Sequence, residues 1–154
     1  MVVICICLFF ANYTVEKNYF AKASLAQGHY FSRVKEAKGI PEDEVWREAN
    51  ESYSYKVLLY NGYEYWSESV KEPDDERDYT IANVIITDPA YKIGFWGIGI
   101  GSSRKQVERV YAFTSKIKDL NRENTIGFID NGIWVEFTFS SDETVSRIAI
   151  YRGP

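Results

Sequence analysis

The sequence predicts an α+β fold in which antiparallel sheet packs against helices. Aromatic residues, which favour strands, make up 16% of the chain. Two Asn-Gly pairs, at positions 61–62 and 131–132, each separate two β-prone runs, which is the strongest short signal for a hairpin. Helical periodicity occurs before the first of these hairpins and again between them. At 154 residues the chain is long enough for one domain with its own core.

Composition excludes several classes of function. The net charge of −4 argues against a nucleic-acid-binding protein, which usually carries a basic face. Cys5 and Cys7 are the only cysteines, so residues 8–154 hold no disulfide framework, thiolate metal site or cysteine nucleophile. The single histidine, His29, has no second histidine to form a cluster. We therefore expect no metal, no cofactor and no catalytic residue.

Residues 2–10 form an uninterrupted apolar run. The run is shorter than the roughly 20 residues of a membrane-spanning helix, and no Lys or Arg precedes it as in a secretory signal. It is an abbreviated signal or anchor, the distal part of a longer span, or a buried strand or helix. We favour the first two, so residues 1–12 are expected to direct export or to tether the chain to a membrane.

An amphipathic helix is predicted for residues 13–39, with Gly39 as its C-cap. Its apolar stripe recurs at steps of three and four residues and consists of Val15, Tyr19, Ala23, Ala26, Tyr30 and Val34. Residues 40–154 are then expected to form a single α+β domain.

The first half of that domain, residues 40–90, begins with Pro41 and three acids, which predicts a short helix carrying Val45, Trp46 and Ala49. A hairpin around positions 61–62 and a third strand over residues 79–87 follow. A two-residue type I′ turn sets the hairpin register, which pairs Tyr60 with Tyr63, Leu58 with Tyr65 and Val57 with Trp66.

The second half, residues 97–152, begins with a capping box, Ser103 and Gln106, and a helix that buries Val107, Val110 and Tyr111. The glycines before it match neither a dinucleotide fingerprint nor a P-loop. A second hairpin follows, and its alternation predicts one core face: Ile126, Phe128, Ile133, Val135, Phe137 and Phe139. A final strand over residues 145–151 points Ile148 and Ile150 inward.

Both halves show the same order of helix, hairpin, charged turn and third strand. This order predicts a tandem repeat of two helix-plus-three-strand units, residues 40–90 and 97–152, preceded by the N-terminal helix.

The segments GIGIGSSRKQVERVY, IWVEFTF and ETVSRIAIY resemble a pattern in which an I-G-x-S entry leads into an amphipathic helix and antiparallel strands. The pattern is similar to the small tandem αβ domains of the β-lactamase-inhibitor-protein-like and SmpA/OmlA-like groups. This resemblance covers residues 97–151 and implies an exported binding or assembly protein. Unlike the inhibitors' repeats, which carry disulfides, this segment has no cysteine, so no inhibitory contact residue is carried over.

These observations predict a non-enzymatic, extracytoplasmic protein-interaction domain, secreted or anchored to a membrane. Its candidate partner-binding residues share one face of the first hairpin: Leu58, Tyr60, Tyr63 and Tyr65. The structural alternative is that a helix or a second sheet covers this face. The sequence identifies neither the partner protein nor the oligomeric state.

Two other functions remain open. An intracellular inhibitor or immunity-type protein would present the acidic residues 74–78 and would need the N-terminal run as folded core. A hydrolase would pair carboxylates such as Glu64, Glu68 and Glu136. The hydrolase is disfavoured, because the sequence pattern predicts that these glutamates face solvent from a sheet.

Overall fold

The fold is that of a computed structural model, which describes residues 30–93, 97–112, 115–116, 124–130 and 133–152. The predicted segment 1–12 and residues 13–29 of the helix predicted over residues 13–39 lie outside these ranges. The described end of that helix is α2, Phe31–Lys38. Within them, no helix is long and apolar enough to cross a membrane.

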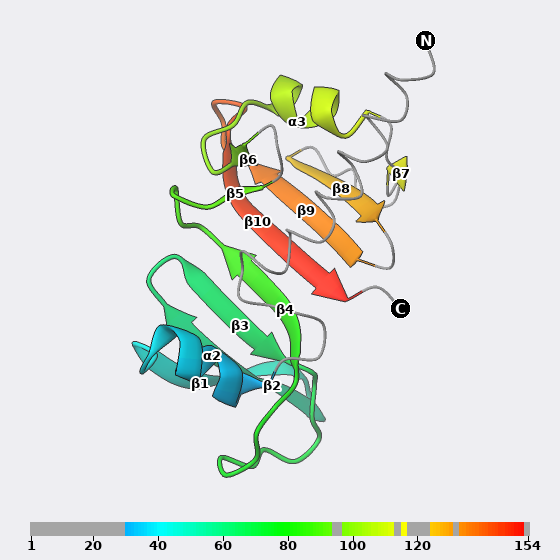
Figure 1. The fold of residues 1–154 in the computed structure, drawn as a ribbon. Coiled ribbons are helices and arrows are strands. Elements are labelled where there is room, and N and C mark those ends of the chain that lie inside the picture. The colour runs from blue at the N-terminus through cyan, green and yellow to red at the C-terminus, as the bar shows by residue number, and fades with distance from the viewer. Residues whose placement is uncertain (1–29, 94–96, 113–114, 117–123, 131–132, 153–154) are drawn as a thin grey trace, which may run out of the picture.

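Eight strands of the described residues form one antiparallel sheet in the order β1-β2-β3-β4-β10-β9-β8-β7 (Figure 1). Within the described ranges, two short helices and the separate β5–β6 pair are the other regular elements. The elements are α2 (Phe31–Lys38), β1 (Asp43–Asn50), β2 (Tyr53–Tyr60), β3 (Tyr63–Ser67), β4 (Ile81–Ile86), β5 (Lys92–Ile93), β6 (Ile98–Gly99), α3 (Arg104–Val110), β7 (Ser115–Lys116), β8 (Thr125–Asp130), β9 (Ile133–Phe139) and β10 (Val145–Arg152).

The predicted α+β class with antiparallel sheet is confirmed, but the division into two helix-plus-three-strand units is wrong. Strand β4 pairs with β10, with Ile86 opposite Ile148 and Val84 opposite Ile150, so both halves belong to one continuous sheet. All four of these side chains are buried. Had the halves been separate, each would have left a long apolar edge strand unpaired.

The helix predicted after Pro41 is also absent, because residues 43–50 form strand β1. This strand pairs with β2 from Asp43 opposite Leu59 to Asn50 opposite Tyr53. The proline and the following acids are local helix signals, and pairing along a whole strand outweighs them. Val45 and Trp46 consequently lie on opposite faces of the sheet and share no helical stripe.

The first hairpin has the predicted register. Its turn is not type I′, because only Gly62, at φ +76°, has a positive φ there. The Gly62 carbonyl accepts hydrogen bonds from the backbone amides of Thr87 and Asp88, so the hairpin tip packs on the end of β4. The second hairpin pairs Asp130 with Ile133 as predicted, while positions 131–132 lie outside the described residues.

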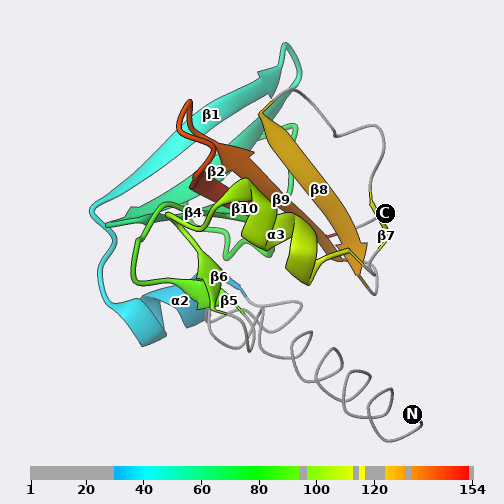
Figure 2. The same ribbon diagram turned by 90° about the horizontal axis from the view of Figure 1, so that it is seen from above.

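The core lies on one face of the sheet, where α2 and α3 pack on the same side (Figure 2). Helix α2 contributes Phe31 and Val34, and α3 contributes Val107. The predicted capping box at α3 and the predicted Gly39 C-cap, at φ +83°, are both present. The inward residues predicted for the second half are buried, except that Val110 and Ile133 are half-buried. The buried ones are Val107, Tyr111, Ile126, Phe128, Val135, Phe137, Phe139, Ile148 and Ile150.

Candidate interaction surface

The structure corrects the placement of the predicted tyrosine-rich patch. Leu58 and Tyr65 are each 0% exposed and belong to the core, while Tyr60 and Tyr63 are half-buried and pack against it. The reason is that this face of the first hairpin points toward α2, whereas the sequence alone left its direction open. Contact of Tyr60 or Tyr63 with a partner stays a prediction.

These tyrosines join three segments of the chain. The Tyr60 hydroxyl donates a hydrogen bond of 2.9 Å to the carbonyl oxygen of Gly39, at the end of α2. The Lys38 ammonium lies 3.8 Å from the centre of the Tyr63 ring. The Tyr63 ring also contacts Tyr65 and Tyr91, with both centroid separations 6.3 Å. The hairpin face therefore anchors both α2 and the segment that follows β4.

Stability is expected to fall at alkaline pH because of this cluster. Burial of Tyr63, its hydrogen bond with Asp88 and the charge of Asp88 raise the pKa of its hydroxyl from 10.0 to about 12. Between these values the folded chain binds more protons than the unfolded chain, so the free energy of unfolding decreases as pH rises from about 10 to about 12. Urea unfolding across this range measures the decrease.

Tyr63→Phe is the matched variant for this measurement, since it keeps the ring and removes the ionisable group. Burial lowers the pKa of the neighbouring Lys38, which changes stability with pH in the opposite direction. The difference between the parent and Tyr63→Phe isolates the tyrosine. Equal pH profiles for the two proteins would contradict the prediction.

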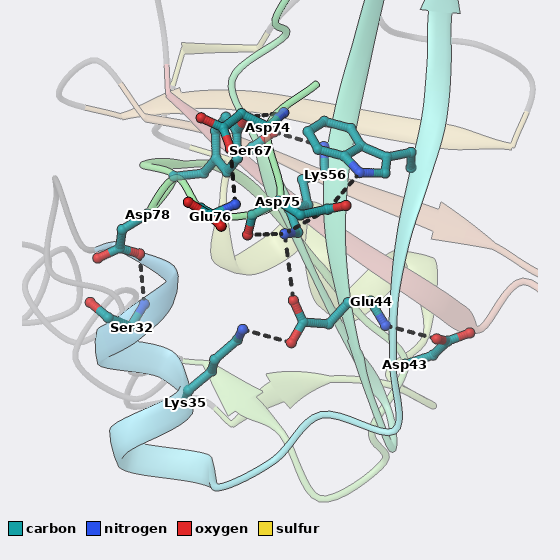
Figure 3. Close-up of polar contacts among 12 residues, drawn as sticks. Ser32, Lys35, Asp43, Glu44, Lys56, Ser67, Asp74, Asp75, Glu76 and Asp78 are labelled. Carbon is teal, nitrogen blue, oxygen red and sulfur yellow. Dashed lines mark hydrogen bonds and ion pairs between the residues drawn. The ribbon is translucent and has the colours of Figure 1, made fainter. Parts of the chain in front are cut away.

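A second polar cluster surrounds Lys56 of β2, which is 6% exposed and is linked to Lys35 of α2 through Glu44 (Figure 3). Its ammonium lies 3.1 Å from Asp75 Oδ1 and 3.8 Å from Glu44 Oε2. The Trp46 indole donates a hydrogen bond of 3.0 Å to the same Asp75 oxygen. Lys35 of α2 pairs with the other oxygen of Glu44 at 2.6 Å. The cluster compensates a buried ammonium and ties α2 to the first two strands.

Two acids of the charged segment 71–78, Asp75 and Asp78, make contacts within the protein in or beside this cluster. Hydrogen bonds from Trp46 and Lys56, with the charge of Lys56, lower the pKa of Asp75. Asp78 accepts a hydrogen bond of 2.9 Å from the Ser32 amide at the start of α2. The described residues contain no group of three His, Cys, Asp or Glu side chains that could hold a metal ion. Asp75 and Asp78 are therefore engaged within the protein.

The acids considered for hydrolysis are not brought together. Glu64 accepts a hydrogen bond of 2.9 Å from the Trp66 indole, and Glu136 accepts one of 3.2 Å from the Tyr151 hydroxyl. Strands β4 and β10 lie between them, which separates their backbones by about 14 Å at the usual strand spacing. Glu68 is exposed beyond the end of β3. This arrangement supplies no paired carboxylates.

A different surface was missed by the sequence reasoning: the face of the sheet turned away from α2 and α3. We call it the open face. Alternation along the paired strands assigns its residues. They are Asp43, Val45, Arg47, Tyr55, Val57, Leu59, Glu64, Trp66, Asn83, Ile85, Thr125, Gly127, Ile129, Trp134, Glu136, Thr138, Arg147, Ala149 and Tyr151.

One row on the open face crosses seven neighbouring strands. The strand registers place its members directly opposite one another, and all but one are aliphatic or aromatic. In spatial order they are Val45, Val57, Trp66, Asn83, Tyr151, Trp134 and Ile129. The signal that could have revealed this row is the run of apolar residues in β2, β4 and β10, which is typical of strands covered on both faces.

The charged groups of the open face are compensated within it. The Arg47 guanidinium lies 4.9 Å from the centre of the Trp66 ring and 3.7 Å from Glu64 Oε2. Glu136 bonds the Tyr151 hydroxyl, as described above. The face thus presents aromatic and aliphatic side chains among paired polar groups, which is the composition of a protein-binding surface.

The comparisons with known proteins show the fold and no family. No protein-family model and no curated protein matches the chain. An extracellular protein containing a SCP domain from Bacillus anthracis matches at a TM-score of 0.58 over 82% of this chain and 44% of its own. A cysteine-rich secretory protein from Staphylococcus aureus matches at 0.51 with the same coverages. Both are 12% identical to this chain.

This chain therefore spans less than half the length of those two proteins. A DUF4309 family protein, YjgB, from Bacillus subtilis matches at a TM-score of 0.43 with 12% identity, over 80% of this chain and 78% of its own. The solved structures that share the fold are the SCP-domain protein and the cysteine-rich secretory protein. The resemblance to the β-lactamase-inhibitor-protein-like and SmpA/OmlA-like groups was therefore wrong.

Proposed function

We propose that the chain is a non-enzymatic, extracytoplasmic protein-interaction domain that binds its partner through the open face. The row of seven residues across the sheet carries this proposal. Trp66, Trp134, Tyr151 and Arg47 are of the residue types that dominate binding energy at protein interfaces. Neither described helix packs on this face, where Ile129 is 37% exposed and Trp66, Trp134 and Tyr151 are half-buried.

Two observations support a location outside the cytoplasm. The apolar residues 2–10 are suited to export or to tethering at a membrane. The structural neighbours with TM-scores above 0.5 are an extracellular protein and a secretory protein. Cell fractionation of the tagged full-length protein tests the location, and recovery from the cytosol alone would contradict it.

Trp134→Ser is expected to weaken partner binding by about 30-fold or more, which corresponds to the loss of one strong interface residue. Trp134 lies near one end of the row, and the change removes apolar area without adding charge. The measurement is quantitative capture of partners from the surface and secreted fractions of the native organism, with residues 2–10 intact and then deleted.

Tyr30→Ser is the control, because Tyr30 is an exposed aromatic residue beside α2, away from the open face. Thermal unfolding of both variants checks that they are equally stable, so that a difference in capture reflects binding and not folding. Equal capture by the two variants would contradict a role for the open face.

A further inference from the structure

We propose that Asn50, at the turn between β1 and β2, is an N-glycosylation site that carries an oligosaccharide on its side-chain amide. The inference does not involve the open face. It rests on one part of the proposed function, the location outside the cytoplasm, because this modification belongs to secreted proteins. Three observations support it: the residues around the asparagine, their exposure at the end of a hairpin, and the conformation of the turn.

Residues 50–52 are Asn-Glu-Ser, which matches the acceptor pattern for N-glycosylation. The pattern is an asparagine, any residue except proline, and then a serine or threonine. It occurs once more in the chain, at residues 12–14, which lie outside the described residues. Because so short a pattern also arises by chance, an acceptor must in addition lie in a surface turn that the transferase can reach.

Asn50 lies at the exposed end of a hairpin. It ends β1 and pairs with Tyr53 at the start of β2, so residues 51 and 52 form the turn. All residues from 47 to 53 are exposed. Figure 2 shows this turn at the tip of the long β1–β2 pair, away from α2 and α3. A bulky, hydrophilic oligosaccharide therefore fits here without the loss of a core contact.

The turn holds the acceptor asparagine in a defined conformation. The Asn50 Oδ1 atom accepts a hydrogen bond of 2.9 Å from the backbone amide of Ser52. This link from side chain to backbone is an Asx turn, and it brings the amide of residue 50 close to residue 52. Asn50 Nδ2 donates no hydrogen bond to any residue in the described part of the chain. The nitrogen that would carry the sugar is thus not engaged within the described fold.

The modification is a transfer from a lipid-linked pyrophosphate oligosaccharide, which is the co-substrate of the reaction. Asn50 Nδ2 forms a bond to the anomeric carbon of the first sugar, and the bond between this carbon and the pyrophosphate oxygen breaks. The lipid pyrophosphate leaves, and Nδ2 gives up one proton. No oxidant or reductant takes part. Because the lone pair of an amide nitrogen is delocalised into its carbonyl group, the step needs a dedicated transferase.

A glycan at Asn50 would lie beside an edge of the sheet. Strand β1 is 8 residues long and, within the described residues, pairs with β2 alone. Such an edge is a template for pairing with another chain, and proteins commonly protect it. A bulky, solvated sugar at the end of β1 would hinder that approach.

Intact mass and peptide mapping of the full-length protein test this inference, with the protein purified from the surface and secreted fractions of the native organism. We expect the peptide that contains Asn50 to carry sugar units, and Asn50→Gln to lose them. Ser52→Ala is expected to lose the glycan as well. Ser52→Thr is the matched variant and is expected to keep it, because threonine also satisfies the acceptor pattern. Circular dichroism checks that the variants are folded.

An unmodified Asn50 in these fractions overturns the inference and leaves the proposed function in place. A glycan confined to Asn12, which Ser52→Ala does not remove, overturns it in the same way. Recovery of the chain from the cytosol alone would instead contradict the extracytoplasmic location, and with it both proposals.

Discussion

Tyr65→Ala is expected to lower the free energy of unfolding by about 3–5 kcal/mol, as for other large aromatic residues removed from a core. The Tyr65 side chain is fully buried and packs against the rings of Tyr60 and Tyr63, at centroid distances of 5.8 and 6.3 Å. Removing it leaves a cavity at the centre of the first half of the sheet. Urea unfolding monitored by circular dichroism measures the change.

The matched control is Tyr53→Ala, in which the same side chain is removed from a residue of β2 that is 43% exposed. Its effect is expected to stay within about 1 kcal/mol. The comparison separates a core residue from a binding residue on the same hairpin, because a partner-binding tyrosine would leave stability nearly unchanged. Similar small effects at both positions would contradict the burial of Tyr65.

Gly62→Ala is expected to lower the free energy of unfolding by about 2–4 kcal/mol. A Cβ at this position would lie 2.6 Å from Cβ of Asp88 and 2.9 Å from its Cα, so backbone would have to move. The positive φ of +76° adds the cost of holding a side chain in the left-handed region. Two backbone hydrogen bonds to the Gly62 carbonyl are disturbed with it.

Gly101→Ala isolates the contribution of the contact. Gly101 has a similar φ of +84°, but a Cβ there would meet nothing within 4 Å. Only the conformational cost, about 1–2 kcal/mol, is expected. If both alanines were equally destabilising, the close approach between the hairpin tip and Asp88 would not contribute to stability.

Several elements could be predicted because their signals are local. The capping box of Ser103 and Gln106 depends on groups three residues apart, and the Gly39 C-cap depends on one backbone conformation. The registers of both hairpins follow from two-residue connections. The inward face of β8 and β9 followed from clean alternation, since only one of their faces carries large apolar side chains throughout.

The candidate site could not be predicted in the same way. Both faces of the first hairpin are apolar, so alternation did not show whether Tyr65 or Trp66 faces the core. The contact of α2 decides it, and this contact joins residues far apart in the chain. The row across the open face likewise exists only because β4 pairs with β10, which aligns residues of β3 with residues of β9.

The sequence by itself thus determined the α+β class, the hairpins, the helix after Ser103 and the inward face of the second half. Tertiary structure alone decided that residues 43–50 are a strand, that Leu58 and Tyr65 are core, and that both halves share one sheet. The physical reason is that turns, caps and alternation act over a few residues, whereas strand order and the covered face depend on long-range pairing, which can override local preference.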